Sequence, residues 1–419
     1  MRILLVTSEI LNIDRPGGGL ASFTDRFSGA LVDLGHQVTI LSYGPERIEV
    51  TRCGVTIEVV SVRGPKWMTL LDILTLRILA PTRTLIFRAR SISRRVTELV
   101  TQGHVDIVQY PNLEALALFH PGAVPAVIRY SSDTLRWREN GGYDLDSGWS
   151  IRQRHFWECR AALAADAVYA PSRLVATVVS RRLRRRVEKI DPPVFSNVDS
   201  PDGSVLQATV GEAPFLLFVG TINRLKGIPI LSEIIFAVLE RYPDIHFVIA
   251  GREGQPYMAE ELRQAAGKHR KRIHITGALP HSSLFAFLKR AHAVVLPSLI
   301  DNLPNTLLEA MQYGCVVIGT RGASFDEMIS DGIDGFLCER NDSSSLFRAI
   351  QHLMELDPSE RISMGEAAVH RVSKMAPETT IPKTIEYFET IIAGKHHQQT
   401  LSLRNPGITD DNRLSRPAP

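Results

Sequence analysis

VVLPSLIDNLPNTLLEAMQYGCVVIGT, residues 294–320, decides the fold, because it holds two apolar runs joined by a loop and a helical pattern. The run Ala293–Leu296 ends at a proline, as expected of a short buried strand. A helical pattern spans 306–314, and a second apolar run follows at once over 315–319. Strand, loop, helix and strand in this order predict a parallel βαβ crossover.

Two carboxylates, Asp301 and Glu309, lie in this loop and helix with seven residues between them. Ligands of open α/β sheets bind beyond the carboxyl ends of the strands, where Asp301 is expected. Glu309 has apolar neighbours on both sides in the helix, and a buried carboxylate needs partners. Adjacent hydroxyls of a ribose or hexose would supply them. The alternative is that Asp301 caps the loop and Glu309 is a solvated helix residue.

The segment PSLIDNLPNTLLEAM resembles the nucleotide-binding motif of the family 4 glycosyltransferases, which share the two-domain GT-B fold. The resemblance implies that Glu309 binds the ribose hydroxyls of a nucleotide diphosphate sugar. Asp301 stands where the family usually has a glutamate, so it keeps the charge but shortens the reach, and the donor sugar stays open. The residues implied to face the sugar and diphosphate beside Asp301 are Leu303, Pro304, Asn305 and Thr306.

Length and composition fit a two-domain α/β protein. The chain has 419 residues, 44% hydrophobic and 22% charged, and its net charge of +3 does not favour nucleic-acid binding. The four cysteines lie far apart, without a zinc or disulfide framework, and MRILLVTSEI lacks the features of a signal peptide. We therefore expect a reducing, cytoplasmic compartment.

The resemblance implies two Rossmann-like domains whose parallel sheets face each other across a cleft. We expect an acceptor-binding domain over 1–193 and a nucleotide-sugar-binding domain over 194–380. Residues 381–393 are expected to form a terminal helix that crosses back to the first domain. Residues 394–419 are polar, lack hydrophobic periodicity and are expected to be disordered.

In each expected domain, a glycine-bearing loop follows the first strand. Gly18 and Gly19 precede a helix, where backbone can approach an anion closely, although a plain tight connection is the alternative. The resemblance implies that this loop reaches toward the donor phosphates and the acceptor. The second domain opens with FLLFVGTINRLKGIPIL, residues 215–231, whose loop carries Arg224 and Lys226. Two cations there suit a diphosphate, although solvated loop cations are the alternative.

The family motif in that second loop is only partly kept. The resemblance implies donor contacts for Gly220 and Thr221, but Thr221 stands where an arginine is expected, so Arg224 is assigned its role. In the first domain, Tyr130 and Ser131 stand where the family places a histidine, and neither is a base near neutral pH. Glu327 matches the family's usual Pro-Glu acid and is expected to cap or orient the helix there.

Residues 66–95 carry seven basic side chains against one acid, interleaved with apolar residues that include Trp67. This pattern suits a segment lying on anionic lipid, which would place the protein peripherally on the cytoplasmic face of a membrane. The alternative is a pair of ordinary helices packed on the domain with arginines in water. No run reaches the roughly 20 apolar residues of a spanning helix.

We predict a retaining glycosyltransferase that moves a hexose-type sugar from a nucleotide diphosphate sugar to a glycan, lipid-linked or other acceptor. The implied catalytic residues are Lys226, Arg224 and Asp301. No metal or other cofactor is expected, since the two cations and helix N-termini would offset the diphosphate charge. The alternatives are a sugar-nucleotide epimerase on the same fold and a non-catalytic sugar-nucleotide-binding protein.

Overall fold

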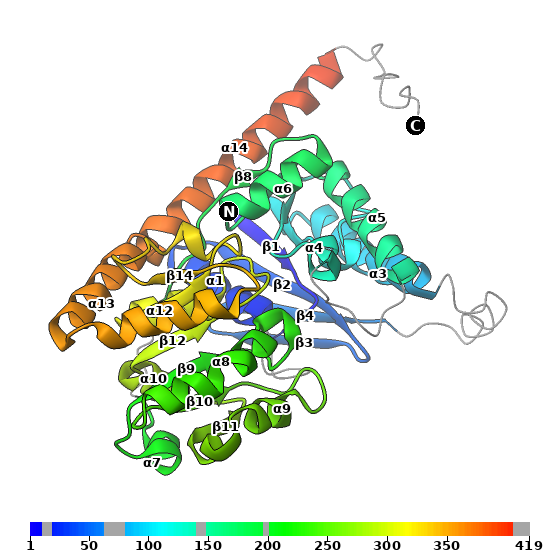
Figure 1. Ribbon diagram of the computed structural model, residues 1–419. Coiled ribbons are helices and arrows are strands. Elements are labelled where there is room, and N and C mark those ends of the chain that lie inside the picture. Colours follow the sequence, from blue (N-terminus) through cyan, green and yellow to red (C-terminus); the bar gives the residue numbers. More distant parts are fainter. Residues whose placement is uncertain (11–18, 63–79, 140–147, 196–200, 405–419) are drawn as a thin grey trace.

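The computed structural model describes residues 1–10, 19–62, 80–139, 148–195 and 201–404 (Figure 1). Their strands form an eight-stranded sheet from the N-terminal half and a six-stranded sheet from the C-terminal half. Helices alternate with the strands along the chain. The described part is therefore an α/β protein with two separate sheets, as the family resemblance implied.

The N-terminal sheet has the order β3-β4-β2-β1-β5-β6-β7-β8, and only its edge pair β3–β4 is antiparallel. Its strands are β1 (Arg2–Val6), β2 (Gln37–Gly44), β3 (Ile48–Arg52), β4 (Val55–Ser61), β5 (Ile107–Pro111), β6 (Ala126–Arg129), β7 (Ala167–Ala170) and β8 (Glu188–Lys189). The helical segments are α1 (Gly19–Asp33), α3 (Ala80–Thr101), η1 (Leu113–Ala115), α4 (Thr134–Glu139), α5 (Gly148–Ala164) and α6 (Arg173–Leu183).

The C-terminal sheet has the order β11-β10-β9-β12-β13-β14 with every pair parallel. Its strands are β9 (Phe215–Val219), β10 (His246–Ala250), β11 (Ile273–Gly277), β12 (Ala293–Leu296), β13 (Val317–Thr320) and β14 (Phe336–Cys338). The helical segments are α7 (Ser204–Val210), η2 (Arg224–Lys226), α8 (Ile228–Arg241), α9 (Met258–Ala265), η3 (Gly267–Arg272), α10 (His281–Arg290), α11 (Asn305–Gln312), η4 (Phe325–Glu327), α12 (Ser343–Glu355) and α13 (Pro358–Ser373).

The core explains why the strands could be found from sequence. Strands of this sheet such as β9 and β12 are buried on both faces, so they read as continuous apolar runs. β12 has the predicted bounds, and α11 begins one residue before the predicted helix, at Asn305. β13 begins at Val317, two residues later than predicted, because the turn after α11 takes up Cys315 and Val316.

The last helix, α14 (Pro377–Arg404), runs from the C-terminal domain along the N-terminal one beside β8 (Figure 1). Its Ile381 and Phe388 are buried in a cluster with residues of β1, and Lys395 forms an ion pair of 2.7 Å with Asp166. The helix continues eleven residues past the expected end at 393, so the prediction of a disordered segment starting at 394 was wrong over 394–404. Residues 405–419 lie outside the described part.

The basic segment 66–95 is described only from residue 80 onward, in α3. There Arg88 forms an ion pair of 3.1 Å with Glu114, and Arg95 forms one of 2.7 Å with Glu58. Two of its basic groups are therefore neutralised inside the molecule. Within the described ranges, no helix has the length and apolar content needed to cross a membrane.

Candidate functional site

The loop after β9 is held at the carboxyl edge of the C-terminal sheet by a side-chain cap and a glycine. Asn223 accepts the backbone N–H of Lys226 at 2.9 Å and so caps η2. Gly227 follows with φ of 81°, and a Cβ atom there would lie 2.0 Å from the carbonyl oxygen of Pro297. Only glycine permits this approach, so the loop lies directly against the segment that follows β12.

Lys226 and Asp301 meet across these two loops. The Lys226 Nζ donates to Asp301 Oδ2 at 2.6 Å, and the side chains are 21% and 9% exposed. The structure thus brings together two of the three predicted catalytic residues. The pair is mostly shielded from water. Removing Lys226 would therefore leave the Asp301 carboxylate buried without a counter-charge, which would destabilise the folded state.

The other predicted residues of the β9 loop lie beside this pair. Gly220 donates its N–H to the Ala250 carbonyl at 3.0 Å and has φ of 151°, a region that favours glycine. Arg224 is exposed, and its backbone N–H donates to Gln255 Oε1 at 2.7 Å. The guanidinium of Arg224 is therefore available to a ligand at the outer side of the loop, while Lys226 lies deeper.

The segment 303–306 forms a tight entry into α11. Leu303 is buried and has a positive φ of 58°, and Pro304 with β-region dihedrals precedes the helix. Asn305 and Thr306 then begin the helix, and their backbone N–H groups have no acceptor within it, whereas the Leu307 N–H donates to the Pro304 carbonyl at 3.0 Å. This N-terminus carries partial positive charge and suits an anion.

Glu309 is a buried carboxylate one turn further along α11. Its exposed fraction is 8%, and no hydrogen bond to its carboxylate forms within the described ranges. Burial raises the pKa of the Glu309 carboxyl to about 7, and the charge of Arg26 opposes that shift. A side chain in this state is ready to accept hydrogen bonds from a ligand that replaces the lost water.

The N-terminal domain reaches this site through α1. A Cβ atom built on Gly19, the first residue of α1, would lie 3.6 Å from the Asn305 Nδ2, so the N-termini of α1 and α11 converge. Gly18 lies outside the described residues. Sequence reasoning missed Arg26, which lies on α1 seven residues after Gly19 and hence on the same face of the helix. The seven-residue spacing from Gly19 was the feature of the sequence from which Arg26 could have been predicted.

The loop after β6 meets residues 297–304 of the other domain, the loop between β12 and α11 that is called the donor loop below. Buried Asn112 organises it by accepting the Ser131 N–H at 2.9 Å and donating to the Ser132 carbonyl at 2.7 Å. The Ser131 carbonyl in turn accepts the Asn302 side-chain N–H at 2.9 Å. Tyr130 is buried in the core with its pKa raised by burial, so its phenol is not a cleft base. Ser131 is the residue that adjoins the donor loop.

Asp133 and Arg182 form a second buried pair just after this loop. Asp133 is fully buried, accepts the Leu135 N–H at 3.1 Å and contacts the Arg182 guanidinium. The pair ties the start of α4 to α6. Sequence reasoning did not find it, because the two residues are distant in the chain and neither belongs to a recognisable motif.

Glu327 joins the domains at a third point. Its carboxylate accepts the backbone N–H groups of Arg173 at 2.6 Å and Leu174 at 2.8 Å, at the N-terminus of α6. Glu327 was expected to cap a helix, and it does so, but the helix belongs to the N-terminal domain. Buried Ser324 beside it contacts the Ser172 hydroxyl at 3.4 Å. The interdomain junction that these contacts form therefore adjoins the candidate site.

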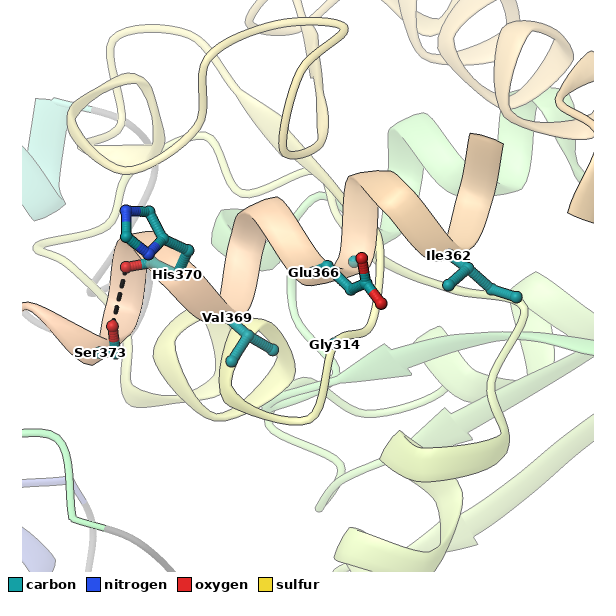
Figure 2. Close-up of a pocket in the computed structure, with 7 residues that line it drawn as sticks. Gly314, Ile362, Glu366, Val369, His370 and Ser373 are labelled. Carbon is teal, nitrogen blue, oxygen red and sulfur yellow. Dashed lines mark hydrogen bonds between the residues drawn. The ribbon is translucent and has the colours of Figure 1, made fainter. Parts of the chain in front are cut away.

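A separate surface hollow lies along α13, away from these residues (Figure 2). Gly314 forms part of its floor, and Ile362 and Val369 give it a largely apolar lining. His370 accepts a hydrogen bond of 2.9 Å through its carbonyl from the Ser373 hydroxyl. None of the predicted site residues lines this hollow, so the candidate site is the junction described above.

Comparisons with known proteins agree with this interpretation. Residues 213–356 match the family model described as glycosyl transferases group 1. D-inositol 3-phosphate glycosyltransferase of Corynebacterium urealyticum is 27% identical over 181 residues, 42% of each chain. A phosphatidylinositol N-acetylglucosaminyltransferase component of Arabidopsis thaliana is 29% identical over 36% of this chain and 34% of its own. These alignments therefore span well under half of either relative.

The whole-chain fold is matched by solved structures. Sucrose-phosphate synthase from Thermosynechococcus elongatus superposes with a TM-score of 0.73 at 17% identity, covering 94% of this chain and 99% of the synthase. An α,α-trehalose-phosphate synthase from Burkholderia vietnamiensis gives 0.68 at 11% identity, covering 93% and 100%. Residues 213–356 therefore form a domain of the glycosyl transferases group 1 family, and the chain as a whole has the GT-B fold.

Proposed function

We propose that this chain is a retaining glycosyltransferase that moves a hexose-type sugar from a nucleotide diphosphate sugar to an acceptor held by the N-terminal domain. The observation that carries the proposal is the state of Glu309. It is a buried carboxylate with a raised pKa and no hydrogen bond from the described residues, beside two converging helix N-termini. Vicinal hydroxyls of a ribose would satisfy both of its oxygens.

The diphosphate would be held by positive groups around Glu309. Lys226 lies at the sheet edge, Arg224 is exposed above it, and the first turn of α11 adds N–H groups without an acceptor in the helix. Asp301 keeps Lys226 in place in the free protein. As charge grows on the departing diphosphate, these groups would stabilise the transition state more than the ground state. On this proposal transfer requires no metal ion, and activity should survive a chelator.

Retention is supported by the residues of the loop after β6. Ser131 occupies the position next to the donor loop, and its hydroxyl does not accept a proton near neutral pH. In the proposed step the acceptor oxygen bonds to the anomeric carbon on the face from which the diphosphate leaves. The bond between that carbon and the diphosphate oxygen breaks with its electron pair, and the acceptor proton passes to the same diphosphate.

Acceptor candidates come from the relatives. One is named for D-inositol 3-phosphate and another for phosphatidylinositol, so a phosphorylated polyol and a lipid-linked polyol belong in the first acceptor panel beside glycans. We infer a cytoplasmic protein with peripheral membrane contact. The identity of the donor can be tested first, because donor binding can be measured without knowing the acceptor.

The test begins with a thermal-shift panel of UDP, GDP and ADP sugars, since a ligand that binds only the folded state raises its apparent stability. Product analysis with the donor that binds then separates the alternatives. Transfer releases free nucleotide and forms a glycosylated acceptor, whereas an epimerase changes the sugar and releases nothing. Binding without turnover across the acceptor panel would indicate a non-catalytic binding protein. Failure of every sugar nucleotide to bind would overturn the proposal.

A further inference from the structure

Helix α5 exposes a narrow stripe of large apolar and basic side chains. Trp149, Phe156 and Leu163 are 55%, 54% and 49% exposed, and Arg152 and Arg160 between them are also exposed. At 100° per residue these five positions fall within an arc of roughly 80° along about 21 Å of helix. The packing of the described residues does not explain three large apolar groups so exposed on one line.

The opposite face of α5 is fixed to the domain, so the stripe is presented rigidly. Ile151 and Ala161 are buried, and the Trp157 Nε1 donates to the Thr82 hydroxyl of α3 at 3.3 Å. Figure 1 shows α5 on the outer side of the N-terminal domain, beside α3 and away from the C-terminal sheet. Helix α5 therefore has apolar side chains on its buried face and on its exposed face. The stripe lies on the exposed face, which points away from the domain.

The charges on α5 have one sign at the surface. Its only acidic residue, Glu158, is buried and accepts the Glu114 N–H at 3.2 Å. Arg152 and Arg160 thus flank Phe156 without an acid on the stripe to offset them. The surface combines an aromatic and aliphatic ridge with positive charge.

We propose that the α5 stripe docks this protein on an anionic lipid bilayer surface. Trp149, Phe156 and Leu163 enter the headgroup region, where amphipathic aromatic side chains are favoured. Arg152 and Arg160 reach lipid phosphates while their aliphatic stems stay in contact with the apolar boundary. The proposal rests on the peripheral membrane contact inferred above and names its surface, and it does not depend on sugar transfer, because vesicle binding is measured without donor or acceptor.

Other occupants fit the stripe less well. The three apolar side chains expose roughly 300 Å², well below the ~800 Å² per partner of a stable protein–protein interface. In a symmetric contact between two copies centred on Phe156, Arg152 of one copy would face Arg160 of the other. That arrangement sets like charges together with no acid on the stripe to pair with them.

Cosedimentation with vesicles of equal parts phosphatidylcholine and phosphatidylglycerol tests the apolar contribution. The wild-type chain should bind, and the triple variant Trp149→Ser, Phe156→Ser, Leu163→Ser should lose at least about tenfold in partitioning. A control triple variant, Tyr257→Ser, Ile333→Ser, Ile362→Ser, removes three apolar residues of the C-terminal domain that are even more exposed, and it should bind as wild type. Circular dichroism confirms that both triple variants are folded.

The double variant Arg152→Gln, Arg160→Gln tests the charge contribution. Each arginine should contribute up to about fivefold at low salt, and the difference from wild type should shrink as salt is raised. Arg270→Gln, Lys271→Gln removes the same charge from exposed positions of η3 and serves as its control. Absence of wild-type binding, or equal binding by the apolar triple variant, would overturn the proposal. A concentration-dependent dimer that the triple variant abolishes, with vesicle binding unchanged, would reassign the stripe to self-association.

Discussion

The two sides of the interdomain junction differ in how far their buried polar groups are hydrogen-bonded. On the C-terminal side, Glu309 keeps a buried carboxylate without a hydrogen bond from the described residues, and the first turn of α11 keeps N–H groups without an acceptor in the helix. On the N-terminal side, Asn112 satisfies the loop around Ser131, and Arg182 contacts one carboxylate oxygen of Asp133, whose other oxygen has no partner among the described residues. The donor side therefore holds unused binding capacity, whereas the opposite loop is organised mainly by its own domain. Substitutions of Glu309 and of the loop that carries Lys226 should affect ligand, and substitutions of the contacts that join the domains should affect the arrangement of domains.

The largest effect is expected from Lys226→Ala. If Lys226 offsets charge on the departing diphosphate, turnover should fall about 10²- to 10³-fold, more than donor affinity, because that charge grows in the transition state. Steady-state kinetics and calorimetry measure the two quantities. Arg224→Ala is the matched control and should cost less, since Arg224 is exposed and, within the described ranges, forms no ion pair like that of Lys226 with Asp301. Equal losses in turnover and affinity would identify Lys226 as a mere structural partner of Asp301.

Glu309→Gln should come next. The amide keeps the shape but removes the charge from the hydrogen bonds to ligand hydroxyls, so donor binding should weaken by about 1.5–3 kcal/mol while the fold is kept. Calorimetry with the best donor measures this loss. Glu366→Gln, an exposed position on α13, is the same change away from the junction and should have no effect. Donor affinity that does not change in Glu309→Gln would remove this residue from the site.

The pH dependence of donor binding should be about tenfold between pH 6 and 8. The pKa of Glu309 is raised to about 7 by burial, so the free protein carries it largely protonated at pH 6 and ionised at pH 8. Because the ionised form accepts ligand hydrogen bonds, affinity should rise with pH across this range. A flat profile for the wild-type protein, or a sloping one retained in Glu309→Gln, would contradict the assignment.

The same group predicts an opposite trend for stability without ligand. A carboxyl whose folded-state pKa is raised favours folding below its unfolded value and loses that contribution as pH rises through the folded value. The free energy of unfolding should therefore fall as pH rises toward about 7, and Glu309→Gln should remove that component. Denaturant unfolding at several pH values measures it.

The smallest effect is expected from Glu327→Gln. The carboxylate caps α6 across the domains, and an amide oxygen can still accept one N–H but without the charge that favours a helix N-terminus. We expect a loss of about 1 kcal/mol in stability, with donor affinity unchanged. Small-angle scattering would show whether the domains separate further. A loss of donor affinity as large as that of Glu309→Gln would show that the junction and the donor site are not separable.

The sequence by itself determined the βαβ unit around residues 294–320. Buried parallel strands appear in a sequence as apolar runs, and the helix between them has local start and stop signals. It also placed Glu309 in a burial-prone turn, since the neighbours of a helical residue are known from the chain alone. The end of α14 was missed, because residues 394–404 are polar and lack the apolar periodicity from which a helix is predicted.

Only the tertiary structure decided which distant residues meet. Lys226 reaches Asp301 because Gly227 allows the loop after β9 to lie against that after β12, a consequence of β9 and β12 being neighbours in the sheet. The charge of Arg26 acts on Glu309, and Glu327 caps α6, because the two domains meet at this junction. The α5 stripe depended on tertiary structure in the same way. Its apolar residues are equally compatible with burial, and only the position of α5 on the domain leaves them in contact with solvent.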